Sequence, residues 1–147
     1  MKKALEITLT TLHLGSERRV VTLQIGDDDQ ITSFLLDLET KNYKAFKQLR
    51  TSIRTACENR HYQNEYKFKN LRDGLYEIKT HLGVRVYAFL DDHAGSCQQL
   101  VIAACGGGKG KEQDAEIQHA REIRRRYLDL RDNQNVTPIL KLLPDEE

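Results

Sequence analysis

The stretch CGGGKGKEQDAEIQHA, residues 105–120, combines residue types that suit phosphate binding. Three consecutive glycines and two lysines, Lys109 and Lys111, lie between an apolar run and a segment with helical spacing. Glycines let backbone N–H groups approach an anion, lysines supply positive charge, and the N-terminus of the following helix adds a favourable dipole. No Ser or Thr follows Lys111, so the P-loop pattern is absent. The stretch therefore predicts contacts with a phosphate backbone, and the alternative is a solvated loop.

Basic side chains concentrate in the middle third of the chain. Residues 41–85 hold 11 basic and 4 acidic side chains, whereas residues 1–40 and 86–147 each carry a net charge of −3. Such a block favours nucleic acid through phosphate contacts and release of counterions. The alternative is a solvated helix face, because residues 42–60 form an amphipathic pattern that contributes many of these cations.

Length and composition indicate one globular domain that needs neither disulfides nor a metal. The chain has 147 residues, of which 39% are hydrophobic and 31% charged. It contains no apolar run of about 18 residues, and its first residues alternate apolar with polar side chains, unlike a signal peptide. We therefore expect a cytoplasmic protein. The three cysteines, Cys57, Cys97 and Cys105, show no CxxC spacing and are expected to be reduced, with Cys105 buried at a strand end and no metal site.

The hydrophobic pattern predicts an order of elements from hairpin to terminal helix. Residues 4–13 and 18–25 alternate apolar and polar side chains around a short turn, as in a β-hairpin. Two helices are expected next, the first with an aspartate as N-cap. Three strands follow at residues 74–80, 84–92 and 98–105, and a last helix covers residues 112–130. The apolar positions that define the three helix faces are Ile31, Phe34, Leu35 and Leu38, then Phe46, Leu49, Ile53 and Ala56, then Ile117, Ala120, Ile123 and Tyr127.

This order predicts an α+β fold with a small, twisted, mainly antiparallel sheet. The two helices on the N-terminal side are expected to pack on one face of the sheet, and a C-terminal helix completes the domain. The other face of the sheet is expected to stay partly open to a ligand. The whole chain, 1–147, is expected to form a single domain, with residues 1–17 as a divergent N-terminal strand extension and residues 134–147 as a loose tail.

Two segments carry a resemblance to a known family: KNLRDGLYEIKTHLGVRVYAFLDD (69–92) and LVIAACGGGKGKEQDAEIQHAREIRRRYL (100–128). Together they resemble the RelE/ParE superfamily of toxins from type II toxin–antitoxin systems, and within it the HigB-like, phage-derived branch. That branch has Leu and Gly ahead of an LYE motif, then a basic residue, then a YRVYF-type strand. A strand ending in two glycines, with a lysine and a glutamine beyond, precedes its last helix. The match extends over residues 71–127, whereas residues 1–17 diverge.

The resemblance implies a RelE-like fold and a toxin that enters the ribosome and cleaves messenger RNA without a metal or other cofactor. In this reaction a ribose 2′-OH attacks the adjacent phosphate and leaves a cyclic phosphate. The reaction needs a base for the 2′-OH, cations near the phosphate oxygens, and an acid for the departing 5′-oxygen. The implied partners are the ribosome, messenger RNA and a cognate antitoxin, expected to be a helix-turn-helix protein. No membrane partner is expected.

Several basic residues receive roles from this resemblance. Lys79 is expected to stabilise the transition state or share the role of base, and its alternative is a solvent-facing lysine. Arg85 is expected to hold a phosphate in a bidentate manner, and its alternative is a surface ion pair with Glu77 or an aspartate. Lys109 and Lys111 are expected to contact the RNA backbone at the border of the cleft. Further phosphate contacts are expected from Lys67, Lys69 and Arg72.

The acid and the base are less sharply indicated. Some relatives carry a tyrosine as acid where this chain has Ile117, so His119, Tyr87 and His81 are alternative candidates, although lone histidines are more often surface residues. Another subset uses a glutamate five residues ahead of an Asn-Leu pair as base, and Glu65 has that spacing.

Glu77 stands where some relatives have a second lysine, which is unfavourable for RNA cleavage. Two alternatives to a ribonuclease therefore remain. One is a non-enzymatic toxin of the same fold that acts on DNA gyrase. The other is a non-toxic RNA-binding or regulatory relative.

Overall fold

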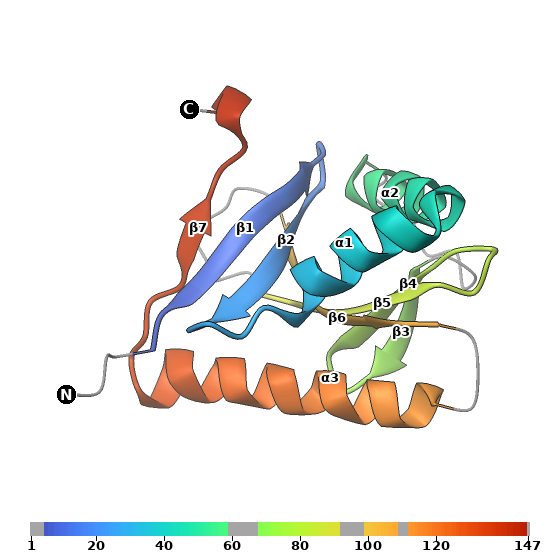
Figure 1. Cartoon of the computed structure of the whole chain (residues 1–147). Coiled ribbons are helices and arrows are strands. Elements are labelled where there is room, and N and C mark those ends of the chain that lie inside the picture. Colours follow the sequence, from blue (N-terminus) through green and yellow to red (C-terminus); the bar gives the residue numbers. More distant parts are fainter. Residues whose placement is uncertain (1–4, 59–67, 92–98, 109–111, 147) are drawn as a thin grey trace.

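A computed structural model describes residues 5–58, 68–91, 99–108 and 112–146, and within them a seven-stranded sheet lies between helices (Figure 1). The sheet order is β3-β4-β5-β6-β2-β1-β7. The elements are β1 (Ile7–Leu14), β2 (Arg18–Ile25), α1 (Gln30–Lys41), α2 (Tyr43–Glu58), β3 (Phe68–Arg72), β4 (Leu75–Lys79), β5 (Arg85–Leu90), β6 (Gln99–Gly107), α3 (Gln113–Leu128), a π-helical turn (Asp129–Asn133), β7 (Ile139–Lys141) and a 3₁₀ turn (Pro144–Glu146).

The predicted α+β class and the mainly antiparallel sheet are confirmed. β1 and β2 form the expected hairpin, and β4, β5 and β6 are adjacent and antiparallel. Two pairs of strands are parallel: β2 with β6, and β1 with β7. The β2–β6 pair joins the hairpin to the three-stranded part, so that one sheet runs through the whole domain.

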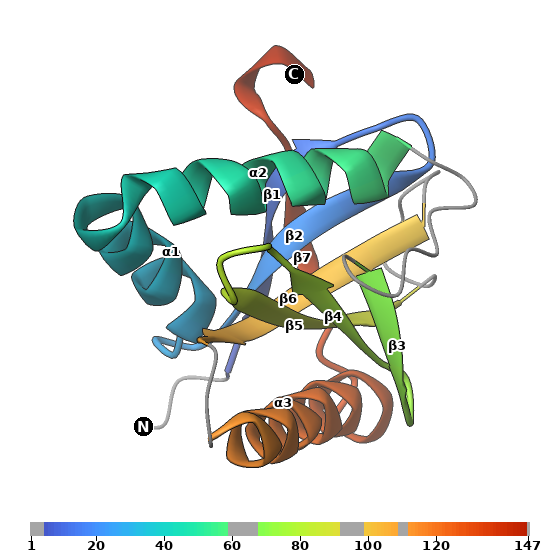
Figure 2. The same cartoon turned by 90° about the vertical axis from the view of Figure 1, so that its right-hand side faces the viewer.

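Helices cover both faces of this sheet (Figure 2). α1 and α2 lie on one face, where Ile31, Leu49 and Ile53 pack with Val86 and Val101 of the sheet. α3 lies on the other face, where its Ala120 and Tyr127 pack with side chains of β4, β5 and β6. The expectation that this second face stays partly open is therefore wrong over the part that α3 covers. Burial of large apolar side chains such as those of Tyr87 and Phe89 on that face requires the cover.

Local signals in the sequence explain where α1 and α2 begin. The Asp29 carboxylate accepts a hydrogen bond from Thr32 N at 3.0 Å, which confirms the predicted aspartate N-cap. α2 follows after Asn42, whose side-chain oxygen accepts a hydrogen bond from Ala45 N at 3.2 Å. The apolar faces of both helices point toward the sheet as the spacing predicts.

The end of the chain differs from the expected loose tail. β7 extends the sheet beside β1, and Arg19 binds the Glu146 carboxylate through both of its terminal nitrogens, with Nη2–Oε1 at 2.5 Å. Arg19 is 5% exposed and also donates to Thr11 Oγ1. A buried guanidinium needs a partner, and the side-chain carboxylate of Glu146 supplies it. β3, at the opposite edge of the sheet, was also not expected as a strand.

None of the helices among the described residues is long and apolar enough to span a membrane.

The two cysteines within the described residues are buried in the core, as expected for Cys105. Burial raises the pKa of both thiols, Cys57 and Cys105, to about 12. Because the thiolate is the reactive form, their reactivity should rise only as the pH approaches that value. In a Cys97→Ser background at pH 8, we expect modification by a thiol reagent to be at least about a hundredfold slower in the folded than in the unfolded protein. Equal rates before and after unfolding would contradict this burial.

Candidate functional site

A cluster of charged and polar side chains lies where β4 and β5 meet the first turns of α3. Side chains alternate along a strand, so Glu77 and Lys79 of β4 and Arg85 and Tyr87 of β5 share the face that α3 covers. Lys79 stands directly opposite Arg85, and Glu77 directly opposite Tyr87. The register also places Arg85 opposite Gly107, at the end of β6. We call this group the strand-end cluster.

Arg85 forms a buried ion pair with Glu77 in the strand-end cluster. Arg85 Nε lies 2.9 Å from Glu77 Oε1, and the two side chains are 10% and 3% exposed. Arg85 Nη1 also donates to the carbonyl oxygens of Gly83 at 3.4 Å and Gly108 at 3.3 Å. The guanidinium therefore holds the turn before β5 and the glycine-rich end of β6 together. Of the two roles considered from the sequence, the observed contacts are those of an ion pair, and the pair is buried rather than at the surface.

The glycines of the opening stretch make close contacts within the protein. A Cβ added to Gly106 would stand 2.2 Å from the Phe34 ring, and one added to Gly107 would stand 1.5 Å from Glu116 Oε2. Nothing lies within 4 Å of the same position at Gly108. Packing thus requires glycine at position 106, against the Phe34 ring of α1, whereas a side chain at position 107 would displace the flexible end of Glu116 on α3. This gives the glycine run a structural reason that does not involve a phosphate.

Glu116 of α3 contacts Tyr87 of β5 and so joins α3 to the strand-end cluster. Tyr87 is fully buried, and its hydroxyl donates to Glu116 Oε1 at 3.4 Å. Burial raises the pKa of Tyr87, with a smaller effect from the Glu116 charge, so the hydroxyl keeps its proton. Burial also raises the pKa of the Glu116 carboxyl, and the hydrogen bond from Tyr87 opposes part of that rise. Tyr87, a sequence candidate for the acid, is thus positioned to orient Glu116 rather than to contact a ligand.

Lys79 differs from its neighbours because it has no carboxylate within ion-pair distance among the described residues. Like charges directly opposite each other on two strands are destabilising. The Glu77 carboxylate offsets the charge of Arg85, whereas Lys79 is half-buried beside them. Lys79 therefore presents a cation at the end of the strands that no carboxylate of the described residues neutralises.

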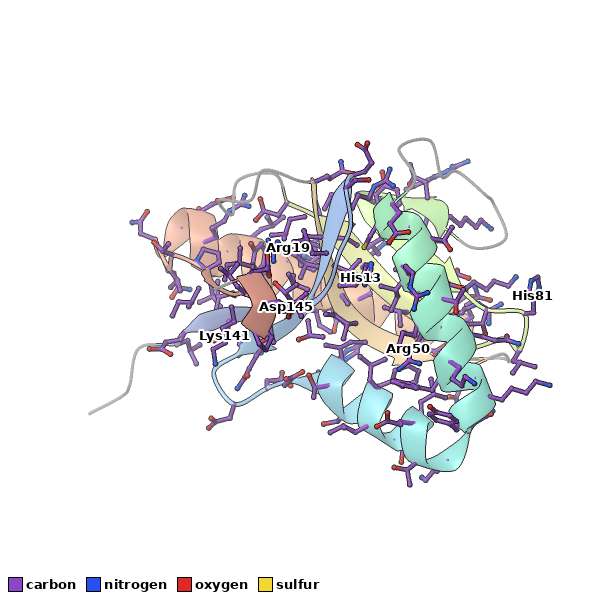
Figure 3. The ribbon with its side chains drawn as sticks, turned by 90° about the horizontal axis from the view of Figure 1, so that it is seen from above. His13, Arg19, Arg50, His81, Lys141 and Asp145 are labelled. Atoms are coloured by element: carbon purple, nitrogen blue, oxygen red, sulfur yellow. The ribbon has the colours of Figure 1, made fainter. Side chains whose placement is uncertain are left out.

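The remaining sequence candidates lie elsewhere. His119 is exposed on α3 and contacts Gln30 Oε1 at the start of α1 through Nε2. His81 is exposed in the β4–β5 turn, away from the other labelled residues (Figure 3). Lys69 and Arg72 are exposed on β3, and Lys69 stands opposite Glu77. The structure thus brings together Lys79, Arg85 and Tyr87 but not the histidines. Four candidates lie outside the described residues: Glu65, Lys67, Lys109 and Lys111.

Two cluster residues on α3 were missed by the sequence analysis. They are Glu116 and Gln113, whose side-chain nitrogen lies 3.5 Å from Glu77 Oε2. Their position in the first turn after the glycine run is the signal that was available. Acidic residues are common in the first turn of a helix because they suit its dipole, so that signal did not distinguish a site.

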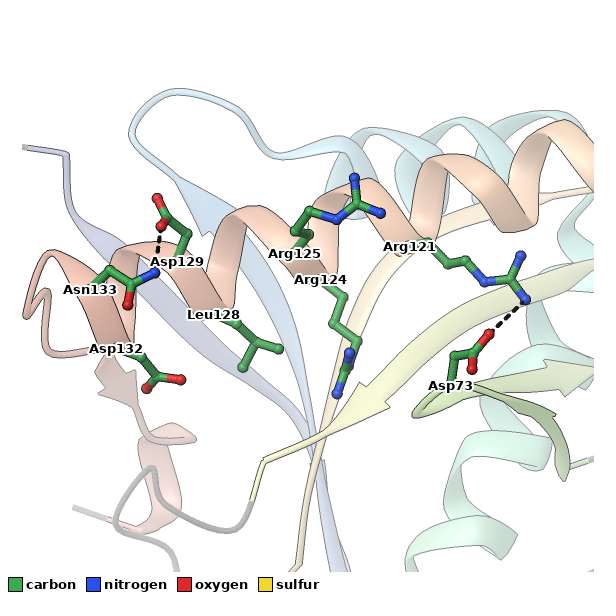
Figure 4. Close-up of a pocket in the computed structure, with 8 residues that line it drawn as sticks. All are labelled: Asp73, Arg121, Arg124, Arg125, Leu128, Asp129, Asp132 and Asn133. Carbon is green, nitrogen blue, oxygen red and sulfur yellow. Dashed lines mark hydrogen bonds and ion pairs between the residues drawn. The ribbon is translucent and has the colours of Figure 1, made fainter.

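A groove lies on the other half of α3, away from the strand-end cluster. It has a volume of about 470 Å³ and is lined by three arginines, three aspartates and two further residues (Figure 4). Arg121 Nη2 lies 3.5 Å from Asp73, and Asn133 donates to Asp129 at 2.8 Å. Positive and negative side chains are equal in number here, so the groove does not select anions. Its lining residues are Asp73, Arg121, Arg124, Arg125, Leu128, Asp129, Asp132 and Asn133.

Comparison with known protein families, with curated proteins and with solved structures finds no match for this chain. The likeness to RelE/ParE toxins therefore stays a prediction from the sequence motifs. The chemistry available at the strand-end cluster is that of one buried ion pair, one half-buried carboxyl with a raised pKa, and one lysine without a carboxylate partner among the described residues.

Gly107→Ala tests the contact between the end of β6 and α3. The new methyl group would displace the flexible Glu116 carboxylate and break its hydrogen bond with the Tyr87 hydroxyl, so we expect the free energy of unfolding to fall by about 0.5–1.5 kcal/mol. Gly108→Ala is the matched control, because its methyl group meets open space and should change stability by less than about 0.5 kcal/mol. Urea unfolding measures both. Equal stability of the two variants would argue against the Gly107–Glu116 contact.

Proposed function

We propose that this chain is the toxin of a type II toxin–antitoxin pair and that it cleaves messenger RNA on the ribosome in the cytoplasm. The observation that carries the proposal is the pair of directly opposed cations, Lys79 and Arg85, at the ends of β4 and β5. Two cations on adjacent strands suit an anionic ligand, and Glu77 neutralises only Arg85 of the two. The sequence motifs that resemble HigB-like toxins include the same two residues.

The cluster offers two of the groups that 2′-OH attack on a phosphate uses, a cation and one carboxyl for proton transfer. The Lys79 ammonium is available to neutralise charge that develops on the phosphate oxygens. Glu116 is a half-buried carboxyl whose pKa is raised by burial and which is hydrogen-bonded to the Tyr87 hydroxyl, and it is our candidate for the acid or base. Arg85 donates a hydrogen bond to the Gly108 carbonyl oxygen, and Gly108 directly precedes Lys109 in the sequence.

The Glu77–Arg85 ion pair favours a second candidate function. An arginine already bound to a buried carboxylate offers less charge to a phosphate than one exposed to solvent. A toxin that binds DNA gyrase without cleaving RNA, or a non-toxic RNA-binding relative, would not need a vacant guanidinium at this place.

Induced expression of the chain without an antitoxin separates these functions. We expect growth arrest, with new messenger RNA ends mapped to the ribosomal A site. Growth arrest with intact messenger RNA and inhibited gyrase would indicate a toxin that binds DNA gyrase. Growth without arrest would indicate a non-toxic RNA-binding or regulatory relative.

The proposed partner is an antitoxin encoded beside this chain, expected to be a helix-turn-helix protein. Its co-expression should abolish the arrest. The neighbouring reading frame is the direct check, because a toxin of this type requires an antitoxin.

A further inference from the structure

The exposed side of α2 carries four cations in a row. Lys44, Lys47, Arg50 and Arg54 are all exposed, and the i, i+3 and i+4 spacings place them along one side of the helix. At 1.5 Å per residue the row is about 15 Å long. We call these four residues the α2 basic stripe. It lies on the exposed side of α2, whose other side packs on the sheet, and α2 covers the sheet face opposite the one that α3 covers (Figure 2).

The α2 basic stripe is not neutralised by neighbouring acids. The one carboxylate of α2 is that of Glu58 at its C-terminal end, where Glu58 lies 3.7 Å from His13 Nε2. Among the described residues, no carboxylate lies within ion-pair distance of the four cations. The nearest pair along the chain, between Lys41 and Asp37, belongs to α1.

Helix stability does not explain these charges. A helix favours acidic residues in its first turn and basic residues in its last turn, because of its dipole. α3 follows this rule, with Asp114 and Glu116 at its start and Arg125 and Arg126 at its end. α2 reverses it, since Lys44 lies in its first turn and Glu58 in its last. The helix dipole therefore does not explain the α2 basic stripe, and it disfavours Lys44.

Other groups stabilise the two ends of α2 in spite of these charges. Asn42 caps the N-terminal end, as described above. At the C-terminal end, Arg18 Nη1 donates to Ala56 O at 2.7 Å, and Glu17 N donates to Cys57 O at 3.0 Å. The helix is thus held by the β1–β2 hairpin, and its exposed side is left for binding.

An aromatic ring lies at the N-terminal end of the stripe. Tyr43 is 53% exposed and stacks on Phe46, with ring centroids 6.2 Å apart. Lys47 lies over the Tyr43 ring and Arg50 over the Phe46 ring, each at 5.6 Å from the centroid. Cations that track a phosphate backbone, with an exposed ring on which a base can stack, are typical of surfaces that bind single-stranded nucleic acid.

We propose that the α2 basic stripe binds the phosphodiester backbone of a single-stranded nucleic acid. A protein partner fits less well, because protein interfaces depend on apolar anchors, and this side of α2 presents cations, polar groups and one aromatic ring. The proposal does not depend on messenger RNA cleavage, because the stripe lies on the opposite side of the sheet from the strand-end cluster.

The test is fluorescence anisotropy of the full chain with a labelled 2′-O-methyl RNA of about 16 nucleotides, which lacks the 2′-OH needed for cleavage. A DNA strand of the same sequence forms the second arm. Lys47→Gln/Arg50→Gln should weaken binding about tenfold or more near 150 mM salt and reduce the slope of log K against log salt by about 1.4. Arg126→Gln/Lys141→Gln is the matched control, because it removes the same charge elsewhere and should bind within about twofold of wild type.

A second variant separates binding from folding. Lys44→Glu/Lys47→Glu places acids in the first turns of α2, so its Tm should equal or exceed that of wild type while binding is lost. Binding of both strands would identify a backbone-only contact, and binding of RNA alone would identify RNA as the ligand; both support the proposal. It is overturned if neither strand binds, which would direct attention to an acidic protein partner, or if the control double weakens binding as much as Lys47→Gln/Arg50→Gln.

Discussion

Arg85→Ala should lower the free energy of unfolding by about 3–5 kcal/mol, because it leaves the buried Glu77 carboxylate without its partner. The guanidinium also donates to Gly83 O and Gly108 O, so the turn before β5 and the end of β6 lose a contact that joins them. Urea unfolding with linear extrapolation measures the change. A loss below about 1 kcal/mol would mean that Glu77 is readily solvated or protonated when Arg85 is absent.

The double variant Glu77→Gln/Arg85→Ala identifies the cause of this loss. It removes the carboxylate charge along with its partner, so it should be more stable than Arg85→Ala alone. If both variants are equally unstable, the packing of the Arg85 side chain, rather than the Glu77 charge, is what matters. Loss of toxicity in Arg85→Ala would therefore report on folding as well as on chemistry.

Much of the fold follows from patterns that are local in the sequence. The alternation of apolar and polar side chains in residues 4–13 and 18–25 predicted the hairpin, and the apolar faces of the three helices predicted which sides pack on the sheet. β3 and β7 were not predicted. β7 has three residues, of which two are exposed, so it lacks the alternation that marks a half-buried strand. Its stability depends on β1 and on the Arg19–Glu146 contact, which joins residues far apart in the chain.

The candidate site was also predictable only in part, because its contacts join residues that are far apart in the chain. The resemblance singled out Lys79 and Arg85, and the strand register places them side by side. Sequence motifs alone do not decide whether Arg85 binds a phosphate or Glu77, because the choice depends on burial. Similarly, the glycine run suggested an anion, whereas the close approach of Phe34 and Glu116 to Gly106 and Gly107 is visible only in three dimensions.

Lys79→Gln should reduce cleavage of messenger RNA on the ribosome by a factor on the order of 10² to 10³, if the proposed function is right. The Lys79 ammonium lies beside Arg85 and lacks a carboxylate partner among the described residues, so its removal takes away charge that a phosphate would use. It also relieves the repulsion between the two opposed cations, so stability should change by less than about 1 kcal/mol. This difference from Arg85→Ala is what makes Lys79 the sharper test of chemistry.

The measurement combines growth after induction, mapped messenger RNA ends on translating ribosomes, and urea unfolding of the purified variant. Lys141→Gln on β7 is the matched control, because it removes one exposed lysine at the far edge of the sheet and should leave cleavage unchanged. Undiminished cleavage by a folded Lys79→Gln variant would show that the active site lies elsewhere. A stable Lys79→Gln variant that no longer cleaves, beside a control that does, would locate the chemistry at the strand-end cluster, because Lys79 stands directly opposite Arg85 there and has no carboxylate partner among the described residues.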